Sequence, residues 1–136
     1  MDAVSFLTQY HKLELQILNK RADIIRKRDL AGSIGSFQVT ERVQSSGSQS
    51  KMADRIIEVV ALEAEIKRLE EMQNDIINVI ESLEAMEYDI LHKFYIQSMS
   101  LSEIGVLYDK TYSWAYKNHS AALNSVQKIL NERKEN

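Results

Sequence analysis

The 136-residue chain contains no cysteine and no proline, and only four glycines. Without cysteine it can form no disulfide and offers no thiolate to a metal ion. The lack of proline and the scarcity of glycine remove the residues that most strongly interrupt helices. No apolar run approaches the roughly 20 residues of a membrane-spanning helix, and the residues after Met1 do not resemble a signal peptide. These absences favour an all-α protein in the cytoplasm.

Charge is low overall and uneven along the chain. The formal net charge is −3. Residues 51–90 contain four Lys or Arg and eleven Asp or Glu, whereas residues 1–50 and 91–136 each carry a net charge of +2. Such a chain is not a strongly basic nucleic-acid binder, but its basic ends can still present a local positive face to phosphates.

The N-terminal segment predicts a helix over residues 4–30, because apolar residues recur there every three or four positions. These residues are Phe6, Leu7, Tyr10, Leu13, Ile17, Leu18, Ile24 and Ile25. Basic residues gather at its end, at Lys20, Arg21, Arg26, Lys27 and Arg28. They favour either an interaction with the negative end of the helix dipole or a phosphate-contacting patch.

Residues 31–50 contain three of the four glycines together with several serines, and no helical period is visible. This composition predicts a Gly/Ser-rich loop. Ser50 is then a suitable N-cap for a second helix.

Beyond residue 50 the sequence predicts one long helix whose apolar residues alternate in steps of three and four, as in a coiled-coil seam. The seam comprises Leu62, Ile66, Leu69, Gln73, Ile76 and Ile80, extended upstream by Met52, Ile56 and Val59. One helix cannot bury this stripe alone, so we expect an antiparallel hairpin with the first helix. Because the first helix is shorter, the uncovered seam predicts a homodimer, with Gln73 helping to set the register. A purely intramolecular bundle also fits the leucines.

The last third of the chain predicts three short helices, the first over residues 83–97. Ser100 and Glu103 form a capping box for the second helix, and Ile104, Leu107 and Tyr108 should share its buried face. Gly105 either permits close approach of another backbone or is a tolerated mid-helix glycine that costs about 1 kcal/mol.

Thr111 is a suitable N-cap for the third helix. Its apolar side consists of Ala115, Ala122, Leu123 and Val126, which leaves Tyr112, Ser113, Trp114, Tyr116, Lys117 and Ser120 for the outer face. The last two helices are therefore predicted to form a helix-turn-helix.

This region resembles the C-terminal DNA-binding helix-turn-helix of bacterial sigma factors and of the ArpU- and RinA-type late-gene activators of phages. The similarity runs through Leu83, Ile90, Leu91, Phe94, Tyr95, Ser100, Glu103, Ile104, Leu107, Thr111, His119, Ala122 and Leu123. Residues 42–54 also resemble a segment typical of one family of small phage proteins. The resemblance implies a hairpin arm over residues 1–82 with loop 31–50, a sigma-like domain over residues 83–136, and a location in the bacterial host cell.

The resemblance further implies a DNA-binding transcription regulator, an activator of late genes, with double-stranded DNA and host RNA polymerase as partners. The candidate DNA contacts are Lys110, Thr111, Tyr112, Ser113, Trp114, Tyr116 and Lys117. Related sigma-like helices carry more basic residues near Ser113 and Ala121. The alternative is therefore a protein-interaction adaptor that binds host RNA polymerase or a phage packaging component.

Residues suited to catalysis or metal binding are scattered. His11, His92 and His119 have no carboxylate at ligand spacing, and the paired carboxylates near Glu63 and Glu70 are typical of a solvated helix face. His119 is expected to be a packed or hydrogen-bonded helix residue. We therefore expect no enzyme, metal, cofactor or small-molecule substrate.

Overall fold

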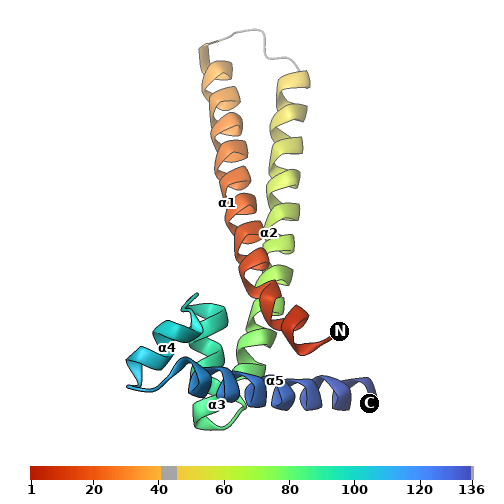
Figure 1. Ribbon diagram of the computed structural model, residues 1–136. Coiled ribbons are helices and arrows are strands. Elements are labelled where there is room, and N and C mark those ends of the chain that lie inside the picture. Colours follow the sequence, from red (N-terminus) through yellow and green to blue (C-terminus); the bar gives the residue numbers. More distant parts are fainter. Residues whose placement is uncertain (41–45, 136) are drawn as a thin grey trace. The chain divides into compact units, whose positions relative to one another are not determined.

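The computed structural model describes the backbone of residues 1–40 and 46–135, and the side chains of residues 1–30 and 50–134. These residues form five α-helices and one π-helical turn, without strands, which confirms the all-α prediction (Figure 1). In chain order the elements are α1 (Ala3–Thr40), α2 (Ser46–Glu81), α3 (Ala85–Leu91), η1 (His92–Ile96), α4 (Leu101–Leu107) and α5 (Tyr112–Glu135). None of the described helices is both long and apolar enough to cross a membrane.

The predicted loop over residues 31–50 is wrong for most of its length. Helix α1 continues to Thr40 and α2 begins at Ser46, four residues before the expected cap at Ser50; residues 41–45 lie outside the described part of the chain. A mid-helix glycine costs only about 1 kcal/mol, and adding a residue to an existing helix is far easier than nucleating one. Without proline, the glycines and serines do not stop either helix.

By contact the chain divides into two compact units. We call Leu15–Glu71 the helix-pair unit, and Met1–Glu14 together with Met72–Asn136 the head unit. This division differs from the predicted one at residues 82 and 83, because the first turns of α1 and the last turns of α2 pack with the C-terminal helices.

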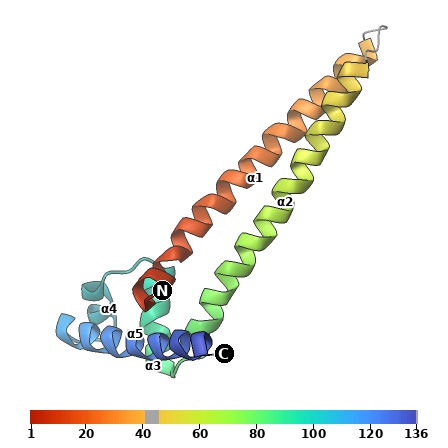
Figure 2. The ribbon, with the colours of Figure 1, turned by 90° about the vertical axis from the view of Figure 1, so that its right-hand side faces the viewer.

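In the helix-pair unit, α1 and α2 lie side by side and run in opposite directions (Figures 1 and 2). Lys20 pairs with Glu65 and Lys27 with Glu58, so residue numbers rise along one helix as they fall along the other. The apolar residues between the helices are Ile17, Ile24, Val59, Ile66 and Leu69, all buried.

Ile56 does not extend this seam. It is exposed, and the half-buried Arg55 lies on the inner side instead, because a strict alternation of three and four steps back from Val59 meets position 55 rather than 56.

One prediction about the charged residues of α1 is wrong. Because α1 ends at Thr40, Lys20 to Arg28 lie far from its C-terminus and the helix-dipole interpretation is wrong. All five basic residues there are engaged in ion pairs, four with glutamates of α2 and one with Asp23. The hydrogen bond from Lys27 holds the pKa of Glu58 below its usual value.

The predicted seam is used within the chain. Ile66, Leu69, Gln73, Ile76 and Ile80 are buried and Leu62 is half-buried. With 38 residues in α1 and 36 in α2, no length of seam is left over. The length difference that predicted a homodimer through these residues is therefore absent.

Gln73 has a local role in the head unit. Its amide donates to the Glu14 carboxylate at 2.8 Å and to the Tyr10 carbonyl at 3.4 Å. The polar residue in the seam is thus satisfied by α1, as a buried amide must be.

Helices α3, α4 and α5 form the rest of the head unit, with α3 and α4 both in contact with α5. A buried cluster of Ile90, Leu101, Ile104 and Ala115 joins one residue or more from each helix. Partly buried residues pack around it, namely Met86, Phe94, Met99, Tyr108 and Trp114.

Candidate functional site

The candidate site is the α4–α5 corner, by which we mean α4, the turn after it and the first turns of α5. Its geometry depends on how the preceding helix ends. The predicted helix over residues 83–97 consists of α3 followed directly by the π-helical turn η1, which ends with a hydrogen bond from Gln97 N to His92 O at 3.0 Å. Ser98 then adopts the left-handed conformation, with φ of 61°. This reverses the chain and lets Ser100 begin α4.

Helix α4 begins as predicted. The Ser100 hydroxyl accepts a hydrogen bond from Glu103 N at 3.1 Å, and the Glu103 carboxylate accepts one from Ser100 N at 3.3 Å. Each partner satisfies an amide that has no acceptor within the helix. The start of α4 is therefore specified by two residues of local sequence.

Helix α4 ends in a tight hydrogen-bonded turn. Lys110 N donates to Gly105 O at 2.7 Å and Asp109 N to Val106 O at 3.0 Å, which is the pairing of a Schellman motif. The motif needs a left-handed residue, and Asp109 provides it with φ of 58°. Aspartate tolerates this conformation better than most residues other than glycine.

Gly105 lies where this turn folds back on α4. A Cβ atom there would lie 2.9 Å from Thr111 O and 3.1 Å from Lys110 O, both backbone atoms. Of the two alternatives considered for this glycine, close backbone approach is the one that the geometry supports.

Helix α5 begins directly after the turn. The Thr111 hydroxyl accepts a hydrogen bond from Trp114 N at 3.1 Å, as its predicted role as N-cap requires. Ala115, Ala122 and Val126 are fully buried, and Leu123 is half-buried. These contacts fix which side of α5 faces outward.

Six of the seven candidate DNA contacts lie together on the exposed surface, at the turn and the first turns of α5. They are Lys110, Thr111, Tyr112, Ser113, Tyr116 and Lys117. The rings of Tyr112 and Tyr116 are stacked with centroids 6.3 Å apart, and the two residues are 56% and 54% exposed. Large aromatic side chains are usually buried at least in part, and these two are more than half exposed. We therefore treat the six residues as a candidate contact surface.

Trp114 is the exception. It is half-buried against the core cluster, with its ring 5.6 Å from that of Tyr108. The sequence placed Trp114 on the outer face because it lies outside the Ala115–Ala122 stripe. Its large ring nevertheless reaches inward from the border of that stripe.

Two turns further along α5 from Tyr112, His119 joins α5 to η1. Its Nε2 atom lies 3.0 Å from the Tyr95 hydroxyl, and Phe94 packs against the same imidazole with ring centroids 4.8 Å apart. Burial lowers the pKa of His119 and raises the pKa of Tyr95. Both groups are therefore neutral near pH 7, and His119 is a packed and hydrogen-bonded helix residue, as expected.

The exposed apolar surface at the end of α4 does not follow from the sequence pattern. Val106 is 79% exposed and Leu107 is 57% exposed, so the prediction that Leu107 faces the core is wrong. With Met99, Ser102 and Glu103 they line a groove of about 400 Å³. Leu101, Ile104 and Gly105 form the buried face of α4 and Tyr108 packs on the same core cluster. At about 100° per residue Leu107 is turned away from that face, toward solvent.

The electrostatics of the corner are mixed. Lys110 and Lys117 are its cations, while Asp109 and Glu103 lie nearby in sequence on the turn and on α4. Among the residues that the structure describes, no three His, Asp or Glu side chains cluster as metal ligands would. The corner is thus suited to contact a surface through aromatic, hydroxyl and a few cationic groups.

Comparison with protein-family models, with curated proteins and with solved structures finds no match to this chain, so the similarity to sigma-like phage regulators stays a prediction from the sequence.

Proposed function

We propose that the chain is a sequence-specific DNA-binding transcription regulator in which α4 and α5 act as a helix-turn-helix. In this proposal α1 and α2 are an antiparallel helical hairpin that carries the motif. The first residues of α5 enter the major groove while α4 crosses the sugar-phosphate backbone. The observation that carries the proposal is the joint exposure of Tyr112, Ser113, Tyr116 and Lys117 at the start of a helix with a capped N-terminus.

Each exposed group has a role that suits DNA. Ser113 can hydrogen-bond a base edge, and Lys117 can reach a phosphate or a guanine. The stacked pair Tyr112 and Tyr116 can cover thymine methyl groups or sugars. Lys110, exposed in the turn, is placed to contact a phosphate. Trp114 is assigned to the core instead.

Rigidity of the corner supports the same proposal. A reading helix must hold its side chains in a fixed register, and here the turn is fixed by the Schellman hydrogen bonds, by Asp109 and by close packing at Gly105. The similarity to late-gene activators of phages suggests that the regulated genes are phage late genes, with host RNA polymerase as a further partner.

Selection of double-stranded DNA from a random pool by the full chain tests this function. We expect an enriched site, and weaker binding to every sequence by Lys117→Ala, with the slope of log affinity against log salt reduced by about 1. Ser113→Ala should relax preference at one base pair, by about 1 kcal/mol, since a hydroxyl makes a single hydrogen bond. Lys128→Ala, an exposed lysine three turns further along α5, is the matched control. Failure to enrich any DNA at low salt, or equal effects of Lys117→Ala and Lys128→Ala, contradicts the proposal.

A second candidate function is favoured by the groove at Val106 and Leu107. Apolar side chains exposed to this degree, beside Glu103, suit a protein surface better than a phosphate backbone. The chain would then be an adaptor that docks on host RNA polymerase. Binding to purified bacterial RNA polymerase that Val106→Asn, a neutral change, abolishes while DNA affinity stays unchanged would establish this role. Polymerase binding that Val106→Asn leaves intact would exclude the groove.

A further inference from the structure

The helix-pair unit exposes large aliphatic side chains on one of its sides. On α1, Leu18, Arg21, Ile25 and Arg28 follow one another in steps of three and four, about a quarter turn from the buried stripe of Ile17 and Ile24. On α2, Ile56, Val60, Glu63 and Glu70 occupy the corresponding side. We call these eight residues the Arg/Glu face.

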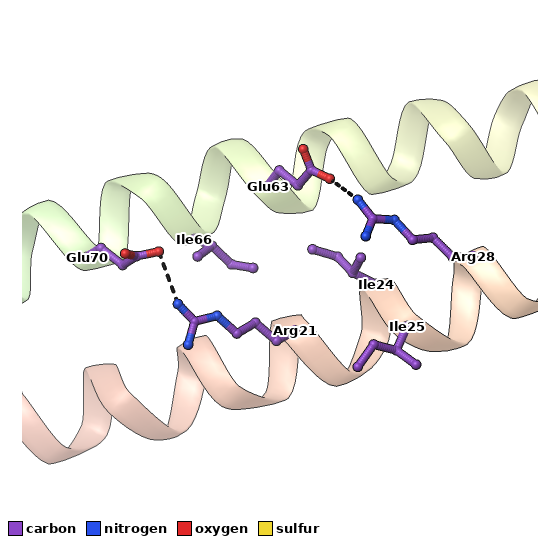
Figure 3. Close-up of a pocket in the computed structure, with 7 residues that line it drawn as sticks. All are labelled: Arg21, Ile24, Ile25, Arg28, Glu63, Ile66 and Glu70. Carbon is purple, nitrogen blue, oxygen red and sulfur yellow. Dashed lines mark hydrogen bonds and ion pairs between the residues drawn. The ribbon is translucent and has the colours of Figure 1, made fainter.

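A groove runs along the middle of the Arg/Glu face. Its floor is formed by Ile24 and Ile66, and it is crossed by two ion pairs, Arg21 with Glu70 and Arg28 with Glu63 (Figure 3). The groove has a volume of about 450 Å³ and continues beside Ile56 and Val60. Apolar side chains at its edges remain exposed, so the ion pairs do not close this face.

The remaining exposed side of the helix pair is mixed. It carries polar residues such as Asn19, Asp23, Arg26, Glu65 and Arg68, together with the exposed aliphatic residues Leu15, Leu30 and Ile57. On the Arg/Glu face, by contrast, Ile25, Ile56 and Val60 line a groove between the two helices, and apolar residues exposed along such a groove suit a second interface.

We propose that the Arg/Glu face binds the same face of a second copy of this chain. Its charges are separated by helix: Arg21 and Arg28 give the α1 edge a charge of +2, whereas Glu63, Glu70 and the exposed Lys67 give the α2 edge −1. A two-fold axis parallel to the helices lays α1 of each copy on α2 of the other. The positive edge then meets the negative edge twice, and each helix has antiparallel neighbours, as in a four-helix bundle.

The size of the face fits a modest dimer. The face runs from Leu18 to Arg28 on α1 and from Ile56 to Glu70 on α2, so it is about 16–22 Å long, and it is two helices wide, about 20 Å. That gives roughly 400 Å² per copy and about 800 Å² in total, in the range of weak and transient interfaces. We expect association in the micromolar range. This interface differs from the predicted seam, which is consumed inside one chain.

Sedimentation of the full chain between about 1 µM and about 100 µM tests the proposal across the expected range. The wild-type chain should pass from monomer to dimer. Ile56→Lys should raise the dissociation constant at least about tenfold, because it places a further positive charge against the positive α1 edge of the second copy. Ile57→Lys is the matched control: the residue type is the same and the two positions are 55% and 65% exposed, but Ile57 lies outside the Arg/Glu face.

Ile25→Glu repeats the test on α1, and circular dichroism shows whether each variant remains helical. A monomer at about 100 µM overturns the proposal. So does a dimer that Ile56→Lys and Ile25→Glu leave intact, or one that Ile57→Lys weakens as much as Ile56→Lys. The measurement contains no DNA, so its failure leaves the DNA-binding proposal standing.

Discussion

The head unit and the helix-pair unit are stabilised in different ways. In the head unit the short helices α3 and α4 and the longer α5 surround fully buried residues such as Ile90, Ile104 and Ala115, and the helix starts and the turn are fixed by hydrogen bonds. The helix-pair unit has a single seam flanked by exposed ion pairs. Its exposed large aliphatic residues are Leu15, Leu18, Ile25, Leu30, Ile56, Ile57 and Val60.

This contrast separates two tasks. Short helices cannot persist alone, so the head unit depends on its core and caps, and they in turn fix the direction of every outward side chain. The long helices α1 and α2 are stabilised along their whole length, so they do not need every apolar residue to be buried. The helix pair therefore keeps exposed apolar side chains that another chain can cover. We expect the head unit to present side chains to a binding partner, and the helix-pair unit to associate with another chain.

The largest expected effect is the loss of core packing in the head unit. Ile104→Ala should destabilise that unit by about 2–5 kcal/mol, since Ile104 is completely buried. Hydrogen exchange of the full chain should accelerate along α4 and α5 and remain unchanged at Ile17–Ile24 in the helix pair. Val106→Ala on the same helix is the control and should change stability by less than about 0.5 kcal/mol. Uniform acceleration throughout the chain would remove the distinction between the units.

A smaller loss is expected from Gly105→Ala. The added methyl meets backbone atoms of Lys110 and Thr111 that cannot move without opening the turn, which costs about 1–3 kcal/mol. The gain in helix propensity of about 1 kcal/mol offsets only part of this cost. Chemical denaturation measures the difference, with the exposed Ser102→Ala as control. A more stable Gly105→Ala variant would show that the close approach does not matter.

Acidification should weaken the head unit through His119. Its pKa is lowered by burial from an ordinary value of 6.5, so the unfolded chain takes up the proton first. The contribution of the neutral imidazole is therefore present above about pH 6.5 and is lost as the pH falls toward the folded-state value. Melting temperatures between about pH 7.5 and pH 5.5 should fall for the wild-type chain and fall less for His119→Gln. Equal slopes in the two proteins would contradict this role for His119.

The smallest effect is expected from an ion pair of the helix-pair unit. Arg28 and Glu63 have side chains that are 63% and 50% exposed, and pairs of this kind contribute about 0.2–1 kcal/mol. A double-mutant cycle of Arg28→Ala and Glu63→Ala, measured below the concentration at which the chain associates, gives the coupling energy. A coupling above about 2 kcal/mol would mean that the helix pair depends on its ion pairs.

Sequence was most informative where structure is local. The capping box at Ser100 and Glu103 and the cap at Thr111 follow from the chemistry of neighbouring residues, and the structure contains both. The heptad spacing likewise identified the buried residues from Ile66 to Ile80, because a helical period is set by the chain itself.

Sequence failed where the outcome depends on distant parts of the chain. Residues 31–40 were assigned to a loop by composition, yet α1 continues through them to Thr40. Leu107 was expected in the core and is exposed, whereas Trp114 was expected on the surface and is half-buried. The space available in the core depends on α3 and η1, which a local sequence pattern does not describe. The π-helical turn at His92–Ile96 has no counterpart in the predicted helix over residues 83–97.

We propose that the first turns of α5 contact DNA. Hydrogen–deuterium exchange of the full chain, with and without the DNA selected from the random pool, is the sharpest test of this contact. We expect new protection at residues 110–117, and unchanged exchange at Leu15–Glu71. Protection confined to α4 around Val106 and Leu107, or no protection at 110–117, would contradict it.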